Sequence, residues 1–226
     1  MTVRMDPQQI IDSLDDCCFD NLGEYNCEES VYDNCDSKVY EYFRSGATKI
    51  ALFFAEDPER VVKIPFSHQE VETDDDDGYE LYEFECAPYT EEGNHWNYCA
   101  SEMHIYELAK MSGVEKYFLK NDFIGKANGH PIYLQPFASP LSEEGYRYNK
   151  VSHEERVSII DECEEKGVHC FNAIWIKDFI LAYGIDELIK LDKFLEDCSL
   201  EDLHDGNLGY FEGRPIIIDY GGFYDY

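Results

Sequence analysis

A six-residue segment near the carboxyl end of the sequence, Asp202-Leu-His-Asp-Gly-Asn207, contains side chains that suit metal and phosphate chemistry. A second short motif, Asp219-Tyr-Gly221, follows it. Carboxylate and amide oxygens are the hard ligands that Mg²⁺ prefers. Phosphoryl transfer from ATP needs such oxygens to hold the metal, a cation for the phosphates and a group that orients the acceptor hydroxyl. The two motifs could supply the oxygens, and a single lysine could supply the cation.

The two motifs resemble the catalytic segment of the kinase-like superfamily, which includes protein kinases, aminoglycoside phosphotransferases and choline kinases. The small-molecule kinases carry Asp-Leu-His-x-x-Asn in the catalytic loop, then a short hairpin and an Asp-Phe-Gly-like triplet. The resemblance implies that Asp202 orients or deprotonates the acceptor hydroxyl, that Asn207 binds one Mg²⁺, and that Asp219 is the main Mg²⁺ ligand. ATP and Mg²⁺ are the cofactors that it implies.

An earlier segment, Val61-Val62-Lys63-Ile64, is similar to the family's Val-Ala-Ile-Lys strand, whose lysine pairs with the phosphates of ATP. Lys63 is therefore expected to neutralise phosphate. Glu102, in the next predicted helix, is the preferred partner of Lys63. Glu107 is the second choice, because the two glutamates project about 140° apart around a helix and only one can point at the lysine.

The resemblance also places the remaining nucleotide contacts. Gln135 and Phe137 fall where the family's hinge meets adenine. Gly46 would cap the phosphates, although the sequence around it has no Gly-x-Gly-x-x-Gly pattern. Each motif alone has an ordinary explanation, since Val-Val-Lys-Ile is usually an edge strand and Asp-Gly-Asn is usually a turn. The complete set in the required order predicts kinase-like ancestry.

The sequence departs from the family around the acceptor side. Leu200-Glu201 replaces the His-Arg that precedes the catalytic aspartate in protein kinases, so no arginine would hold a phosphorylated activation loop. The printed sequence runs to Tyr226, shortly after Gly221, without an activation segment. We therefore expect a reduced C-terminal lobe. It lacks the family's acceptor platform unless the acidic N-terminal extension, a loop or a second subunit supplies one.

Hydrophobic periodicity and turn signals predict the elements that position these residues. Asp-Pro and Asn-Gly pairs mark two hairpins, and Ser152-His-Glu-Glu155 is a capping box. Residues 17–36 and 80–94 are acidic and are expected to be irregular. The expected strands cover residues 48–54, 60–66, 122–126, 132–135, 208–211 and 215–218. The expected helices cover residues 6–16, 97–111, 152–167, 171–183 and 185–195.

The order of these elements indicates an α+β chain with two lobes, and the resemblance implies that it is a minimal protein-kinase-like fold. Residues 1–44 form an acidic N-terminal extension, and residues 45–137 form an N-lobe with an antiparallel sheet and one helix. Residues 138–226 form a reduced helical C-lobe that ends just after the Asp-Tyr-Gly motif.

The charge of the chain is unusual, with 49 acidic residues against 18 basic ones and a formal net charge of -31. Such a field repels nucleic acid, anionic lipid and free nucleotide at long range and attracts basic proteins. We expect no direct binding to nucleic acid or membrane. Nine scattered cysteines without a Cys-x-x-Cys motif, and no long apolar run, are typical of a cytoplasmic protein with reduced thiols. A zinc site that uses Cys27 and Cys35 is an open alternative.

Three functions stay open on the sequence alone. The first is an ATP- and Mg²⁺-dependent phosphotransferase with an unknown acceptor, for which a basic protein suits the field. The second is a highly acidic inhibitor that imitates the phosphate pattern of DNA, as small acidic phage proteins that block host defences do. The third is a pseudokinase that binds nucleotide as a structural ligand. The pattern does not predict the oligomeric state.

Overall fold

The computed structural model describes residues 4–15, 42–45, 49–54, 56–65, 67–74, 80–87, 97–127, 129–141 and 152–221. The chain divides into two compact units, one of Met1–Ser101 with Asn121–Pro136 and one of Glu102–Lys120 with Phe137–Tyr226. Helices and antiparallel sheets occur in the same chain, which confirms the α+β class. The segment 102–120 belongs to the second unit, whereas the sequence places it in the N-lobe.

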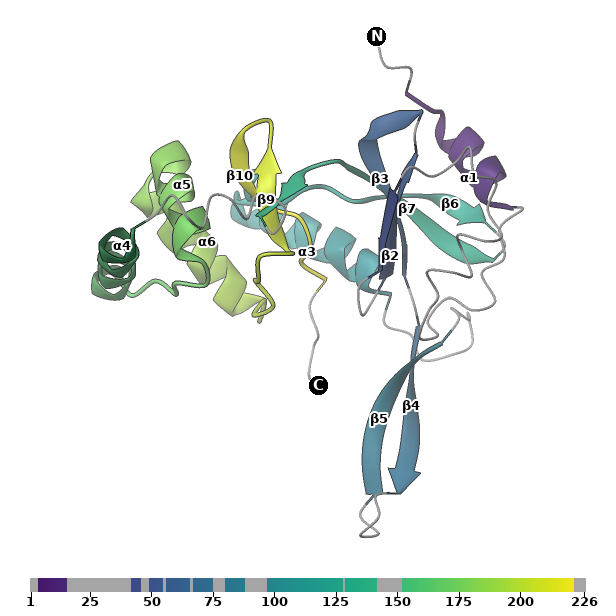
Figure 1. The fold of residues 1–226 in the computed structure, drawn as a ribbon, viewed down its shortest axis with the longest axis horizontal. Coiled ribbons are helices and arrows are strands. Elements are labelled where there is room, and N and C mark those ends of the chain that lie inside the picture. The colour runs from purple at the N-terminus through teal and green to yellow at the C-terminus, as the bar shows by residue number, and fades with distance from the viewer. Residues whose placement is uncertain are drawn as a thin grey trace. The chain divides into compact units, whose positions relative to one another are not determined.

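The first unit is built on a five-stranded antiparallel sheet in the order β1-β2-β3-β7-β6 (Figure 1). The predicted hairpin between residues 48 and 66 is confirmed, with a register shift between Phe53 and Phe54 that lets β3 start early. The Asn-Gly hairpin is confirmed as well. The strands are β1 (Tyr42–Ser45), β2 (Lys49–Phe54), β3 (Asp57–Pro65), β6 (Asp122–Ala127) and β7 (His130–Pro136).

Helix α1 (Pro7–Asp15) covers part of this sheet. Its residues Ile10 and Leu14 are fully buried, in one apolar cluster with residues of β2, β3, β6 and β7. The Asp6 carboxylate accepts a hydrogen bond from the amide of Gln8 at 2.9 Å, which caps the helix, and Pro7 occupies its first position. Gly125 of β6 allows the close approach, because a Cβ there would lie 2.5 Å from a methyl carbon of Ile11.

Two further strands, β4 (Ser67–Asp74) and β5 (Glu80–Ala87), form an antiparallel ribbon of their own (Figure 1). The expectation that residues 80–94 are irregular is therefore wrong for Glu80–Ala87. Apolar and acidic residues alternate through most of this segment, and a period of two is the pattern of a strand. High acidity hid that pattern, because glutamate has low strand propensity on its own.

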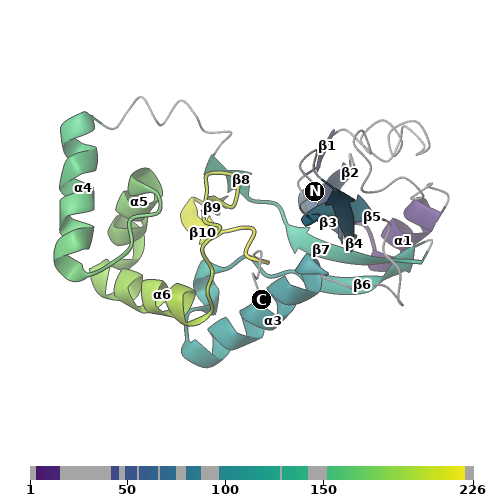
Figure 2. The same cartoon turned by 90° about the horizontal axis from the view of Figure 1, so that it is seen from below.

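The second unit contains a small sheet in the order β10-β9-β8 and a set of helices. Figure 2 shows α5 beside α4 and α6, and α5 also contacts β10. Helix α3 begins at the end of the first unit and continues in the second. The elements are α3 (Tyr98–Ser112), the 3-10 turn η1 (Glu115–Tyr117), β8 (Ser139–Pro140), α4 (His153–Lys166), α5 (Ala173–Tyr183), α6 (Ile185–Asp197), β9 (Leu208–Phe211) and β10 (Arg214–Ile217).

Local capping explains where these helices begin and end. Ser152 accepts a hydrogen bond from the Glu155 amide at 3.2 Å, as the capping box predicts, and Gly167 ends α4 in the left-handed conformation with φ of 69°. Helix α5 starts two residues later than predicted, because the Asn172 side chain accepts from the amides of Ile174 and Trp175.

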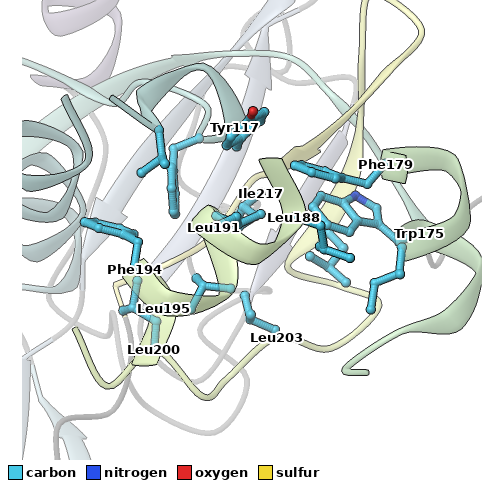
Figure 3. Close-up of a cluster of buried hydrophobic side chains, with 14 of the residues drawn as sticks. Tyr117, Trp175, Phe179, Leu188, Leu191, Phe194, Leu195, Leu200, Leu203 and Ile217 are labelled. Atoms are coloured by element: carbon cyan, nitrogen blue, oxygen red, sulfur yellow. The ribbon is translucent and has the colours of Figure 1, made fainter. Parts of the chain in front are cut away.

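An aromatic and leucine-rich core holds the second unit together (Figure 3). Trp175 is fully buried, its ring lies 5.1 Å from that of Phe179, and its indole N–H donates to the Gly209 carbonyl at 3.2 Å. This bond ties α5 to β9. Residues of α6 and of the loop after it complete the core, among them Leu188, Leu191, Phe194, Leu195, Leu200 and Leu203.

Four cysteines whose side chains the structure describes, Cys99, Cys163, Cys170 and Cys198, are free thiols. Burial raises the pKa of Cys163 to about 12, so this thiol stays protonated at neutral pH. Cys27, Cys35 and the predicted irregular segment 17–36 lie outside the described residues. Within the described ranges, none of the helices combines the length and the apolar character that crossing a membrane requires.

Candidate functional site

The Asp202–Asn207 segment forms a compact loop between α6 and β9 in the second unit. Buried Leu203 anchors the loop in the core. The backbone N–H of Asn207 donates to the His204 carbonyl at 2.9 Å and closes a turn. The Gly206 amide donates to Nδ1 of His204 at 2.9 Å, which fixes the imidazole against the same turn. The loop is therefore held by its own hydrogen bonds as well as by its apolar anchor.

Asn207 connects the two ends of this loop. Its Nδ2 donates to the Asp202 carbonyl at 2.7 Å and to Oδ2 of the Asp202 carboxylate at 3.2 Å. Only 9% of Asn207 is exposed, whereas the Asp202 carboxylate reaches solvent. The buried amide thus orients an accessible carboxylate.

The backbone of Asn207 also joins the loop to the second motif. Its carbonyl accepts from the amide of Ile218 at 2.8 Å and from the amide of Asp219 at 3.3 Å. The segment after β10 is thereby fixed beside the loop. The structure brings Asp202, Asn207 and Asp219 together within one unit.

Neighbouring residues to which the sequence analysis gave no role support this geometry. Nε2 of His204 lies 3.7 Å from the Asp202 carboxylate. Nδ2 of Asn172, the residue that caps α5, donates to the Asp205 carboxylate at 2.5 Å. The sequence could have identified Asn172 as a helix cap, because an asparagine there precedes an apolar helix. Nothing in the sequence links Asn172 to Asp205.

The oxygens of Asn207 and Asp219 fit a Mg²⁺ ion in their chemistry. Oδ1 of Asn207 accepts no hydrogen bond from the described part of the chain, so it is available as a ligand. Among the described residues, no group of three or more His, Cys, Asp or Glu side chains is arranged to hold a metal ion. Mg²⁺ usually keeps several waters and binds one or two protein oxygens together with substrate phosphates. An amide oxygen and one carboxylate are sufficient for that mode and insufficient for a metal held by protein alone.

The predicted phosphate lysine belongs to the first unit. Lys63 is buried on β3, where it lies opposite Ala51 of β2 and Tyr133 of β7. Gln135 is buried on β7 opposite Val61. Both residues lie in predicted strands, and the sheet order places these strands in its interior.

Glu102 and Phe137 belong to the second unit, and Gly46 lies outside the described residues. Glu102 is fully buried on α3, whereas Glu107 is exposed and forms an ion pair with Lys110 at 3.6 Å. Burial therefore favours Glu102 over Glu107 as an interior partner for a cation. The pairing of Glu102 with Lys63 stays a prediction.

Two depressions of the second unit adjoin the loop. One lies over the loop itself and is lined by Phe171 and by residues 201–205. The other, of about 340 Å³, lies between α6, the start of the loop and the segment before α5. Phe171, Glu201 and Leu203 line both, so the second depression continues from the first.

Comparison with known proteins adds no assignment, since no protein-family model matches the chain and no curated protein matches it significantly.

Proposed function

We propose that this protein is an ATP- and Mg²⁺-dependent phosphotransferase on a reduced, two-lobed, kinase-like fold. The observation that carries the proposal is the set of hydrogen bonds made by Asn207. Its side chain orients Asp202, and its carbonyl holds the backbone of Asp219. A turn that served only to connect α6 with β9 would not need its asparagine to bond an exposed carboxylate and the start of a second motif.

Each residue has one task in the proposed reaction. Asp202 accepts the hydrogen bond of the acceptor hydroxyl and takes its proton as the acceptor oxygen bonds to the γ-phosphorus. The bond from that phosphorus to the ADP oxygen breaks in the same transfer. Asn207 and Asp219 would hold Mg²⁺, which supplies charge neutralisation on the phosphates when it is bound.

The remaining assignments concern nucleotide binding. Lys63 neutralises the phosphates, and Glu102 positions that lysine. Gln135 and Phe137 hold adenine at the hinge, and Gly46 caps the phosphates. Burial of Lys63 and Glu102 supports these roles, because a buried lysine and a buried glutamate are costly unless each faces an opposite charge.

The test is thermal unfolding with and without Mg-ATP, followed by transfer of labelled γ-phosphate. A nucleotide at about 100 times its Kd stabilises a protein by about 2.7 kcal/mol, which raises Tm by about 5–10 °C for a chain of this size. Asp219→Ala should abolish the rise. Asp202→Asn should keep the rise and lose transfer, because the amide still accepts the Asn207 bond but cannot take a proton. A wild-type protein without any response to Mg-ATP would refute the proposal.

A second candidate is an acidic inhibitor or DNA-mimic protein on a pseudokinase scaffold, which the net charge of -31 favours. Carboxylates spread over a surface can occupy the groove of a basic nucleic-acid-binding protein. Binding of that kind would persist in Asp219→Ala and weaken steeply with salt. Loss of partner binding in Asp219→Ala would point back to the nucleotide site.

A further inference from the structure

The 340 Å³ pocket beside the loop has an apolar wall on one side. Leu195 of α6, Leu200 between α6 and the loop, and Leu203 of the loop contribute to it. Figure 3 shows these three leucines close together. Phe171 also lines the pocket, and its ring is supported by Trp175 with a centroid distance of 5.5 Å. A wall of this kind suits a ligand with an apolar stem.

The polar lining of the same pocket is acidic. Asp192, Glu196 and Glu201 contribute carboxylates, and no lysine or arginine is among the described residues that line it. His169 also lines the pocket, with a largely exposed ring. A cation that enters the pocket would meet several negative charges at short range.

Asp192 provides an independent sign that this pocket takes a ligand. Only 7% of the residue is exposed. Its Oδ1 accepts from the His169 amide at 3.2 Å and lies 3.2 Å from Nδ1 of the same histidine. Its Oδ2 has no hydrogen-bond partner within the described part of the chain. That oxygen is therefore open to a donor from a bound cation, and the bond would be a charge-assisted one to a carboxylate that is largely removed from water.

We infer that this pocket binds an arginine side chain of a basic polypeptide. A guanidinium presents several N–H donors in one plane, so it can bond Asp192 and Glu201 together and stack on Phe171. The methylene stem of arginine can lie along the leucines while its head reaches the carboxylates. The overall charge of -31 draws such a polypeptide toward the protein.

The pocket also indicates a substrate class, a consequence that rests on the proposed phosphotransferase function. Glu201 directly precedes Asp202, and the depression that contains Asp202 continues into the pocket. A polypeptide anchored by arginine would place a hydroxyl-bearing residue a few positions away over the Asp202 carboxylate. The proposed acceptor is therefore a serine, threonine or tyrosine near an arginine.

The first measurement is fluorescence anisotropy with a labelled peptide of glycine, serine and arginine, in the absence of nucleotide. A peptide with citrulline in place of arginine is the matched control, because citrulline keeps the shape and lacks the charge. We expect the citrulline peptide to bind at least about tenfold more weakly, since bonds to charged groups contribute that much or more. A lysine peptide should fall between the two. Equal binding of the arginine and citrulline peptides would overturn the inference.

The second measurement locates the binding on the protein. Asp192→Asn and Glu201→Gln should each weaken arginine-peptide binding by about tenfold. Asp197→Asn removes the same charge from an exposed position of α6 outside the pocket and should change binding by less than about twofold. Glu201 is exposed, so its variant keeps the test valid if Asp192→Asn fails to fold. A loss in Asp197→Asn equal to that in the pocket variants would show that net charge alone attracts the peptide.

The two proposals fail in different ways. If the pocket variants lose the peptide while wild-type protein shows no response to Mg-ATP, the arginine site stands and the phosphotransferase does not. If Mg-ATP stabilises the protein and the pocket variants bind the peptide as wild type does, the arginine site is refuted and the nucleotide site stands.

Discussion

Asn207→Asp places a carboxylate where the structure has a hydrogen-bond donor. In the wild type, Nδ2 of Asn207 donates to the carbonyl and to Oδ2 of Asp202, at 2.7 and 3.2 Å. The substitution keeps the size and shape of the side chain but removes both donors. It also places a second negative charge near the Asp202 carboxylate, at about the 3.2 Å that now separates Nδ2 of Asn207 from Oδ2 of Asp202. The loop should therefore lose its internal connection without any change in packing.

The expected loss of stability at neutral pH is about 3 kcal/mol. Each of the two hydrogen bonds contributes about 1 kcal/mol net. Repulsion between the carboxylates adds about 1 kcal/mol even in a water-like medium, and burial of the new charge at a position with 9% exposure makes the total a lower bound. The estimate does not depend on whether nucleotide or metal binds.

The loss should depend on pH in a defined direction. Burial and the oxygens of Asp202 raise the folded-state pKa of the introduced carboxyl above its unfolded value of about 3.9. Between these two values the folded variant binds more protons than the unfolded chain, so its stability falls as pH rises. The destabilisation is complete above the folded-state pKa and shrinks as pH falls toward about 4, where the protonated carboxyl can donate to Asp202 again.

Urea unfolding at about pH 7 and about pH 4 measures both effects. Asn97→Asp is the matched control, because Asn97 accepts from the Ala100 amide at 3.0 Å at the start of α3, where a carboxylate caps equally well. Nδ2 of Asn97 also donates to the Tyr133 hydroxyl at 2.7 Å, but a hydroxyl can turn and donate to the new carboxylate instead. That variant should change the free energy of unfolding by about 0.5 kcal/mol or less. The proposed loop geometry is refuted if Asn207→Asp costs no more than Asn97→Asp, or if its cost is the same at both pH values.

Two further predictions concern the surroundings of the site. Gly209→Ala should cost about 3 kcal/mol in urea unfolding, because its Cβ would lie 2.3 Å from the Ser139 carbonyl oxygen. Gly213→Ala, with φ of 76° but open space around it, should cost about 1 kcal/mol, and equal costs would contradict the close approach of β8 and β9. Hydrogen bonds from Lys190 and from residues of η1 lower the pKa of Glu187 to about 2, so the stability that this carboxylate contributes should be present above its ordinary pKa of about 4.5 and lost as pH falls toward about 2. Acid titration of Glu187→Gln should lack that part of the loss, and an unchanged acid profile would count against the interaction.

Local signals in the sequence predicted the parts of the fold that local physics decides. The capping box at Ser152 and the glycine at position 167 mark the ends of α4, and the Asn-Gly pair marks the turn between β6 and β7. The ribbon of β4 and β5 was missed because acidic residues masked its alternation. Strand β1 was missed for a related reason, since it follows a long acidic segment and contains only four residues.

Contacts between distant positions could not be predicted in this way. The motif pointed to Asp202, Asn207 and Asp219, but not to the bonds by which Asn207 holds the other two. The arginine pocket is a stronger example, because His169 and Asp192 lie on different segments and meet only after α5 and α6 have folded together. Neither residue belongs to a motif, and the sequence alone does not distinguish either from an ordinary surface residue.

The net charge of -31 gives the two proposed ligands opposite dependences on salt. The field of the protein opposes the approach of ATP and favours that of an arginine peptide, and both effects act over the Debye length, about 8 Å at physiological salt. Added salt screens both effects. It should therefore weaken binding of the peptide and strengthen binding of ATP, until the salt concentration is high enough to screen the contacts inside each site. Contacts inside a site are screened much less than exposed charges. If a fitted pocket binds the peptide, added salt should lower the affinity only in part, and the difference between the arginine and citrulline peptides should persist. If a diffuse acidic surface binds it, salt should remove both the affinity and the difference.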